Sequence, residues 1–313
     1  MKGRRYDLTE IDECYLMKPF IGPLVIAARK FFENIEIPEE LDLKSITVRQ
    51  GYNTGEIMII LMAENGQAPF INAFKEFIIN FFAKPNEENK LTEKDKLVSI
   101  YFIHYFNKKG YRKSYQENLL WGESAFSETL SVGNGNNLGF KVAPLAFLQP
   151  NTVQAEKLYQ LVIEAAEFTG NEIVFDLFCG TGTIGIFCAT VAKKVYGIEL
   201  NESAVMNAKA NAISNEIENV EFVVGDVNKA LMQLESKPEV IIVDPPRAGL
   251  MPETIEAICS SSASKLIYVS CNPTSMARDL AMLRKGGFKI TFIQPVDQFC
   301  HTYHIECVAK LEK

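Results

Sequence analysis

A glycine-rich turn follows an apolar run in the sequence Val174-Phe175-Asp176-Leu177-Phe178-Cys179-Gly180-Thr181-Gly182-Thr183, and a helix-like stretch begins at Ile184. The glycines at positions 180 and 182 carry no side chain, so a ligand can approach the backbone there closely. The next apolar run ends at Glu199, whose carboxylate can accept hydrogen bonds from two ribose hydroxyls. This arrangement predicts a strand, turn and helix that bind a nucleotide-like ligand.

Two classes of enzyme use a turn of this spacing. It fits a nicotinamide-dependent oxidoreductase as well as an enzyme that uses S-adenosyl-L-methionine. Asp176 at the end of the strand is typical of adenosylmethionine binding, because no pyrophosphate then has to be held at the helix start. The sequence therefore favours S-adenosyl-L-methionine as the cofactor, and the Rossmann oxidoreductase remains the alternative.

The rest of the chain predicts two domains. Apolar runs of strand length alternate with helical stretches at residues 195–198, 220–224, 240–243 and 266–269. Such runs belong to a parallel sheet covered by helices. Only a loop separates the closing runs 288–293 and 303–311, so we expect that last pair to be antiparallel. We expect this α/β domain over residues 141–313 and a small α+β domain over residues 1–140.

Composition excludes several classes of protein. The longest apolar run, Ile57–Ala63, is far shorter than the roughly 20 residues of a membrane span, and the first residues lack the apolar stretch of a signal peptide. The seven cysteines include no CxxC pair, which favours a reducing compartment and predicts a cytoplasmic protein. A net charge of −7 argues against a broadly polybasic nucleic-acid binder, although it leaves room for a local basic patch.

Two further motifs end the fourth and fifth predicted strands of the sheet. In Val243-Asp244-Pro245-Pro246-Arg247 the prolines fix the backbone, so Asp244 should point into the crevice at the carboxyl ends of the strands. Amino-group methyltransferases carry an aromatic residue where Arg247 stands, which disfavours methylation of an exocyclic amine. In Ser270-Cys271-Asn272-Pro273 the neighbouring strand places a thiol beside Asp244.

A thiol in such a crevice suits methylation of a pyrimidine at C5. That carbon is too weakly nucleophilic to attack a methyl sulfonium, but addition of a thiolate at C6 makes it reactive. A general base must then remove the C5 proton. The tail His301-Thr302-Tyr303-His304-Ile305-Glu306-Cys307 offers histidines and a carboxylate. A metal site there is the competing interpretation; we expect no metal, because the tail has no second ligand cluster and the chemistry needs none.

Together these motifs resemble the RNA uridine-C5 methyltransferase family, which makes 5-methyluridine in tRNA or 23S rRNA. The resemblance covers about residues 115–313 and includes Phe147-Leu148-Gln149-Pro150-Asn151. It implies a class I S-adenosylmethionine-dependent methyltransferase, Rossmann-like, with a mostly parallel seven-stranded sheet and an antiparallel C-terminal strand. It also implies that Cys271 is the nucleophile and Glu306 the base. With the glycines of the turn, the expected cofactor and uracil site comprises Gln149, Phe178, Gly180, Gly182, Thr183, Glu199, Asp226 and Asp244.

The N-terminal part departs from the family pattern. Members usually extend further, often with an OB-type RNA-binding module, which this chain is expected to lack. Some hold an iron–sulfur cluster on four cysteines; Cys14 falls near the place of the last one, and its partners would lie upstream. One local basic segment interleaves with tyrosines and predicts RNA contact, with a solvated hairpin tip as the alternative. Its basic residues are Lys108, Lys109, Arg112 and Lys113.

The sequence thus predicts an RNA (uracil-5-)-methyltransferase that acts on structured RNA through a covalent adduct between Cys271 and C6 of the target base. Neither DNA nor a membrane is an expected partner. An RNA cytosine-C5 methyltransferase shares the thiol chemistry and remains an alternative, as does an RNA-binding protein with a vestigial site.

Overall fold

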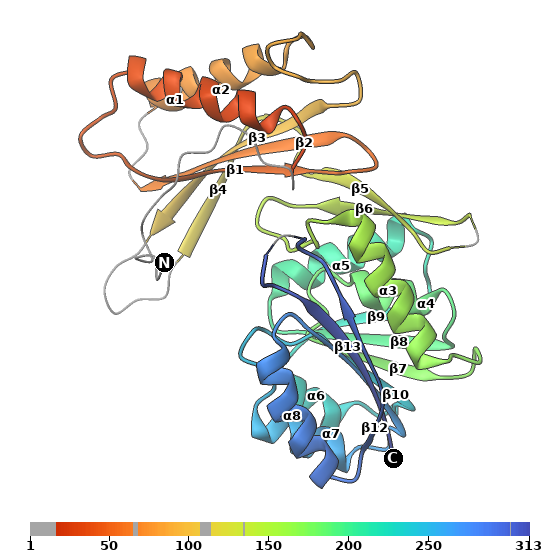
Figure 1. Ribbon diagram of the computed structural model, residues 1–313. Coiled ribbons are helices and arrows are strands. Elements are labelled where there is room, and N and C mark those ends of the chain that lie inside the picture. The colour runs from red at the N-terminus through yellow and green to blue at the C-terminus, as the bar shows by residue number, and fades with distance from the viewer. Residues whose placement is uncertain (1–16, 65–67, 107–113, 134, 301) are drawn as a thin grey trace. The chain divides into compact units, whose positions relative to one another are not determined.

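The computed structural model describes residues 17–64, 68–106, 114–133, 135–300 and 302–313 (Figure 1). The chain divides into two compact units, Met1–Phe126 and Ser127–Lys313. The sequence placed this division near residue 140, and the difference is the hairpin of β5 (Phe126–Ser131) and β6 (Asn137–Val142). Asn215 accepts a hydrogen bond from Gly139 N at 2.7 Å and Asn211 accepts one from Lys141 N at 2.9 Å, so β6 belongs to the second unit.

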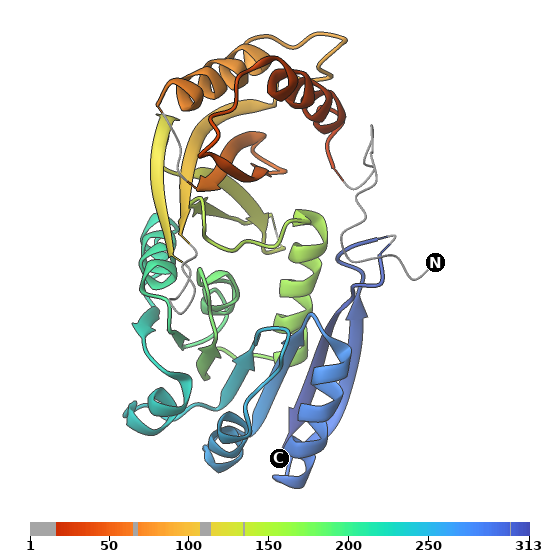
Figure 2. The same ribbon diagram turned by 90° about the vertical axis from the view of Figure 1, so that its left-hand side faces the viewer.

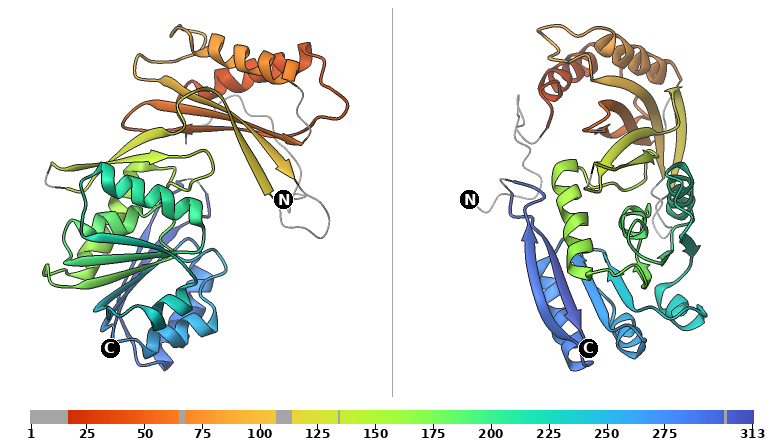
Figure 3. Two further views of the ribbon diagram at one scale, coloured as in Figure 1. Left: turned by 180° about the vertical axis from the view of Figure 1, so that it is seen from behind. Right: turned by 90° about the vertical axis from the view of Figure 1, so that its right-hand side faces the viewer.

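The first unit is a four-stranded sheet with two helices on one face (Figures 2 and 3). Its strands follow the order β1-β2-β3-β4, and β2 pairs parallel with β3, because α2 forms the crossover between them. Ile57, Ile59 and Leu61 of β2 pack in one core with Phe74 and Ile78 of α2. The elements are α1 (Ile21–Asn34), β1 (Asp42–Gln50), β2 (Glu56–Glu64), α2 (Ala68–Phe82), β3 (Lys96–Phe106) and β4 (Ser114–Gly122).

The second unit is built on a seven-stranded sheet of order β12-β13-β11-β10-β7-β8-β9. Only β13 runs antiparallel to its neighbours, β11 and β12. This confirms the mostly parallel sheet with an antiparallel last strand that the sequence predicted. The strands are β7 (Ile173–Leu177), β8 (Lys194–Glu199), β9 (Val220–Val224), β10 (Val240–Val243), β11 (Lys265–Ser270), β12 (Lys289–Val296) and β13 (Glu306–Glu312).

Helices cover both faces of this sheet (Figure 3). One face packs against α6, α7 and α8 in a shared core that includes Phe175, Ile241 and Leu266, and α3, α4 and α5 lie over the other face (Figure 1). Within the described residues, no helix combines the length and apolar character of a membrane span. The helices are α3 (Thr152–Ala166), α4 (Thr183–Ala189), α5 (Glu202–Ser214), α6 (Val227–Gln233), α7 (Pro252–Ser260) and α8 (Pro273–Lys285).

The strand order changes direction beside β7. From β7 the chain moves outward through β8 and β9, and it then returns to β7's other side with β10 and β11. Open α/β sheets bind ligands at such a switch point, outside the carboxyl ends of the strands. The glycine-rich turn follows β7, and Asp244 follows β10, so the topology brings the predicted motifs to one place.

Candidate active site

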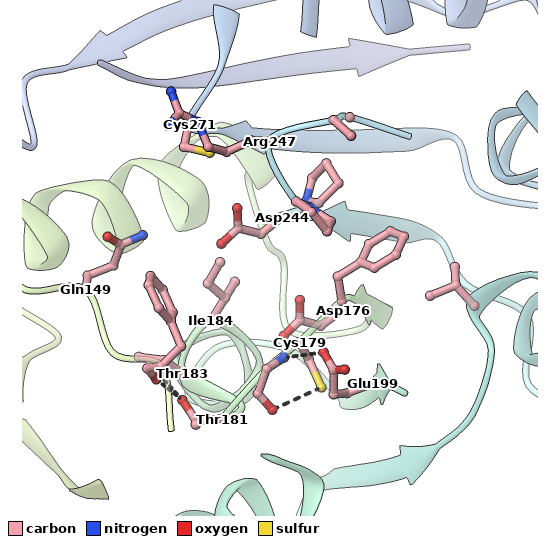
Figure 4. Close-up of a pocket in the computed structure, with 18 of the residues that line it drawn as sticks. Gln149, Asp176, Cys179, Thr181, Thr183, Ile184, Glu199, Asp244, Arg247 and Cys271 are labelled. Atoms are coloured by element: carbon pink, nitrogen blue, oxygen red, sulfur yellow. Dashed lines mark hydrogen bonds between the residues drawn. The ribbon is translucent and has the colours of Figure 1, made fainter. Parts of the chain in front are cut away.

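A cavity of about 1140 Å³ opens at the carboxyl ends of β7, β8, β10 and β11 (Figure 4). It gathers side chains from segments that lie far apart in the sequence. Most predicted site residues line it: Gln149, Phe178, Gly180, Thr183, Glu199, Asp226, Asp244, Cys271 and Glu306. Gly182 does not line the cavity.

The turn after β7 is fixed against the end of β8. Phe178 has a left-handed backbone with φ of 65°, and its N–H donates to Ile198 O at 2.9 Å. Gly180 N donates to Glu199 Oε2 at 3.2 Å, and Asn201 N donates to Glu199 Oε1 at 2.8 Å. These bonds orient the Glu199 carboxylate at the edge of the turn, where it can meet a ligand.

The two glycines of the turn have different roles. No heavy atom beyond the neighbouring residues lies within 4 Å of the place where a Cβ at Gly180 would stand, so the backbone leaves open space there. A Cβ at Gly182, whose φ is 78°, would lie 2.5 Å from Phe222 Cζ and 2.8 Å from Ala208 Cβ. Gly182 therefore allows close packing of the turn against β9 and α5 instead of close approach of a ligand.

Two loops at the cavity are tied together by their amides. Asn151 Nδ2 donates to Gln298 O at 3.0 Å, and Gln298 Nε2 donates back to Asn151 O at 3.2 Å. The Asn151 side chain also caps α3 by accepting from Gln154 N. The loop that carries Gln149 is thereby held against the segment that leads to Glu306, and Thr181 Oγ1 fixes the same loop by donating to the carbonyl of Phe147 at 2.9 Å.

The cavity wall carries several buried carboxyl groups. Burial, with Asp244 as the second cause, raises the pKa of Asp176 to about 8, against the opposing effect of the backbone N–H of Gly185. Burial raises the pKa of Asp244 to about 6. Burial and Asp244 raise the pKa of Glu306 to about 7, against the opposing effect of Arg247. Such a wall favours a cationic ligand, because positive charge would stabilise the ionised carboxylates.

Cys271 directly follows β11 and lies beside Arg247 in the cavity (Figure 4). The antiparallel register pairs Ser270 with Cys307, which brings the preceding residue of β13, Glu306, opposite Cys271. Burial is the largest cause that raises the pKa of the thiol, and the carboxylates of Glu306 and Asp244 add to it, whereas Arg247 lowers it. The structure thus brings the predicted nucleophile, base and orienting acid together.

Comparisons with known proteins identify the family. A family model described as tRNA (Uracil-5-)-methyltransferase matches residues 110–313. The chain belongs to this family. An uncharacterized RNA methyltransferase from Protochlamydia amoebophila is 34% identical over 325 residues, which cover 99% of this chain and 73% of the relative. Another uncharacterized RNA methyltransferase, from Caldanaerobacter subterraneus, is 35% identical over a stretch that covers 100% of this chain and 67% of the relative.

A solved structure agrees with this assignment. The tRNA (uracil-54, C5)-methyltransferase from Pyrococcus abyssi, in complex with S-adenosyl-L-homocysteine, has a TM-score of 0.73 at 28% identity and covers 98% of this chain and 70% of its own. The predicted uracil-5-methyltransferase family and class I fold are therefore confirmed, and the family argues against the nicotinamide-dependent oxidoreductase. The chain spans 64% to 73% of the length of eight curated relatives that it matches.

This RNA methyltransferase carries a polar rim beside its thiol. Arg247 Nη2 lies 3.3 Å from His304 Nδ1, and both residues line the cavity. His301, the other histidine of the tail, lies outside the described residues. Within the part of the chain that the structure describes, no group of three histidine, cysteine, aspartate or glutamate side chains is arranged to hold a metal.

The methyltransferase cavity also contains a residue that the motifs did not reveal. Tyr159 of α3 lines its wall and packs on Phe187, with the ring centroids 5.0 Å apart. Burial is the main cause that raises its pKa, followed by Asp244, Glu306 and Asp176, so the phenol keeps its proton. Tyr159 lies in none of the sequence motifs described above. The predicted RNA contacts at Lys108, Lys109, Arg112 and Lys113, and Cys14, lie outside the described residues.

Proposed function

We propose that this methyltransferase uses S-adenosyl-L-methionine to methylate C5 of a uracil in structured RNA, tRNA or 23S rRNA, and so makes 5-methyluridine. The observation that carries the proposal is the meeting of Cys271, Asp244 and Glu306 in one cavity with the glycine-rich turn. Thiol addition at C6 is the chemistry that makes a pyrimidine C5 nucleophilic.

The cavity fits the cofactor. The open space at Gly180 accepts a ligand against the backbone, and the oriented Glu199 carboxylate suits ribose hydroxyls. The buried carboxyls favour the positive charges of a sulfonium and an ammonium group. When bound, this cofactor supplies an electrophilic methyl group. The residues that would hold it are Gln149, Phe178, Gly180, Thr183, Glu199 and Asp226.

The first step belongs to Cys271. Burial and the nearby carboxylates keep the Cys271 thiol protonated before the reaction. As the sulfur bonds to C6 of the uracil, the thiol proton passes to water and the C5=C6 electrons move onto O4, which gives an enolate that is nucleophilic at C5. Arg247 favours the thiolate. Asp244, with a pKa of about 6, is mostly a carboxylate at pH 7 and accepts from the N3–H of uracil. Cytosine has no proton at N3, so this acceptor favours uracil over the cytosine alternative.

The last step belongs to Glu306. Its carboxylate removes the C5 proton after methyl transfer, the C5–H electrons form the C5=C6 double bond, and the S–C6 bond breaks with Cys271 leaving as thiolate. A pKa of about 7 suits this role, because a general base works best when its pKa lies near the working pH. The uracil must be unstacked to enter the cavity, so a flipped or looped nucleotide is the expected target.

RNA that carries 5-fluorouridine tests the proposal. The fluorine cannot leave C5 as a proton does, so the wild-type protein with the cofactor should remain covalently bound to this RNA. Cys271→Ala should form no adduct, and Cys300→Ala should trap RNA as the wild type does, because Cys300 does not line the cavity. Covalent trapping by Cys271→Ala would refute the mechanism.

The RNA species and its outer contacts complete the proposal. Mapping of 5-methyluridine in tRNA and rRNA from a deletion strain identifies the lost position, and intact modification in both would refute the substrate assignment. Lys108, Lys109, Arg112 and Lys113 are proposed to hold RNA phosphates, and the protein is proposed to act in the cytoplasm.

A further inference from the structure

We propose that Arg278 and Asp279 of α8 are positioning residues for the cysteine chemistry: they clamp the segment 247–250, which begins at Arg247, against the turn that carries Cys271. This inference rests on the proposed function. Cys271 follows β11, Arg247 follows β10, and the clamp residues belong to α8. Hydrogen bonds between side chains and backbone join these segments.

Asp279 is the buried centre of the clamp. Its side chain is fully buried, and Oδ2 accepts from Leu250 N at 2.7 Å and from Tyr268 Oη at 2.7 Å. Oδ1 pairs with Arg278, whose Nε lies 2.8 Å away and whose Nη2 lies 2.7 Å away. The carboxylate thus joins the end of the segment 247–250 to β11 and to the helix that follows Cys271.

Arg278 holds the same segment from outside. Its Nη2 donates to Ala248 O at 2.8 Å and to Leu250 O at 3.3 Å. The side chain is 54% exposed, so it adds little to the core. Its guanidinium nevertheless contacts three acceptors, which are Asp279 Oδ1 and the carbonyls of Ala248 and Leu250. A planar guanidinium that pairs with a carboxylate and two carbonyls fixes geometry in a way that an ammonium group cannot.

The turn at Cys271 supplies the remaining bond. Asn272 caps α8 by accepting from Thr274 N at 3.1 Å, and its Nδ2 donates to Arg247 O at 2.9 Å. The backbone of Arg247 is therefore tied to the residue next to the nucleophile, and the clamp holds the three residues that follow. The guanidinium of Arg247 is in turn the group that lowers the pKa of Cys271, against Glu306 on β13 and Asp244 after β10.

Release of the clamp should therefore act on the thiol. With Arg278→Ala the segment 247–250 loses two backbone hydrogen bonds and the buried Asp279 loses its cationic partner, so the melting temperature should also fall, whereas Arg278→Lys keeps the charge. Arg247 then stays beside Cys271 for less of the time. We expect alkylation of Cys271 by iodoacetamide to shift to higher pH, and single-turnover trapping of 5-fluorouridine RNA to slow by roughly ten- to a hundredfold, as expected for a small misplacement of reacting groups.

The experiment has four readouts. Mass spectrometry follows the alkylation of the Cys271 peptide as a function of pH. The rate of RNA trapping, the affinity for S-adenosyl-L-homocysteine and the melting temperature are measured beside it. Arg284→Ala, which removes the same charge from an exposed position of α8, is the control. Arg278→Lys should lie between wild type and Arg278→Ala. The inference would be overturned if Arg278→Ala left both the pH profile of Cys271 alkylation and the trapping rate unchanged. It would also be overturned if the affinity for S-adenosyl-L-homocysteine fell as much as the trapping rate, because that would indicate a general structural role.

The outcomes also separate the clamp from the proposed function. If the wild-type protein traps no 5-fluorouridine RNA, the proposed function fails, while the alkylation profile of Cys271 still reports on the clamp. If the wild type traps RNA and Arg278→Ala matches it at every pH, the function stands and the clamp is refuted.

Discussion

Replacement of Asp176 by asparagine should make the stability of the cofactor-free protein less dependent on pH. Burial and Asp244 raise the pKa of this carboxyl from 3.8 to about 8. Between those values the folded protein binds more protons at Asp176 than the unfolded chain does, so the contribution of this one group to stability is fully present below about pH 4 and is lost as the pH rises towards 8. At about 1.4 kcal/mol per pH unit, the group costs the wild type on the order of 4 kcal/mol between pH 5 and pH 8.

Asparagine does not titrate, so the variant should not suffer this loss. Asp244 and Glu306 titrate in both proteins, with pKa values of about 6 and 7, and their contributions largely cancel in the comparison. Water that enters the cavity makes 4 kcal/mol an upper limit, and about 1 kcal/mol moves the melting temperature of a unit of this size by roughly 2–4 °C. Relative to wild type, Asp176→Asn should gain up to about 16 °C when the pH changes from 5 to 8.

Differential scanning calorimetry of the cofactor-free protein at both pH values measures this gain in the transition of the second unit. Asp297→Asn, which changes an exposed aspartate of the same unit, is the control and should melt as the wild type does. A melting-temperature difference between Asp176→Asn and wild type that is the same at pH 5 and pH 8 would refute the reasoning. The variant should also bind S-adenosyl-L-homocysteine more weakly, because the cavity then offers less negative charge to its ammonium group.

Glu306→Gln should accumulate the covalent adduct with unmodified RNA, seen as a stable shift on a denaturing gel, and normal turnover by this variant would contradict the assigned base. In the wild type, the elimination rate should rise with pH through about 7 as Glu306 loses its proton, and a flat profile from about pH 5.5 to 8.5 would exclude that role. Gly182→Ala should destabilise the protein by roughly 2–4 kcal/mol in urea unfolding, because its Cβ would overlap Phe222. Gly180→Ala should cost only about 1–2 kcal/mol of stability and should mainly weaken cofactor binding. Equal losses of stability in the two variants would argue against these separate roles. Glu199→Gln should lower the affinity for S-adenosyl-L-homocysteine by roughly ten- to a hundredfold in titration calorimetry, because hydrogen bonds to a charged acceptor contribute a free energy of that size. An affinity equal to that of the wild type would show that Glu199 does not hold the ribose.

The sheet was predictable because its central strands are apolar on both faces. Each run, such as Val240–Val243, forms one strand near its predicted limits. β4 carries no such signal, because its residues are mostly exposed and no alternation of polar and apolar residues marks it. In α1, Gly22 and Pro23 resemble a break, yet proline is tolerated in the first turn of a helix, where its missing N–H costs nothing.

The candidate site was predictable where a motif ends a strand. Asp244 and Cys271 follow adjacent parallel strands, so the fold alone brings them to the same edge of the sheet. Gly182 shows the limit of this reasoning. A short G-x-G spacing indicates either close approach of a ligand or close packing of a helix, and only the position of Phe222 shows that packing applies here.

The clamp at Asp279 could not be predicted from the sequence. Its partners, Leu250 and Tyr268, come from separate elements, and neither the type nor the spacing of these residues indicates a contact. Short motifs reveal groups that touch the reactants, because their chemistry restricts the residue type. Residues that position those groups need only a geometry that the folded chain supplies, and they become visible once the strands are in place.

Several of the acidic groups behind the chain's net charge of −7 are gathered in the cavity. Asp176, Glu199, Asp244 and Glu306 line it, and Arg247 is the one lysine or arginine among its described lining residues. Such a cavity attracts a cationic cofactor and admits a neutral base, but it repels the phosphates that flank that base. We therefore propose that basic residues outside the cavity hold the RNA backbone, and we expect the weakening of RNA binding by salt to depend on those residues rather than on the carboxylates.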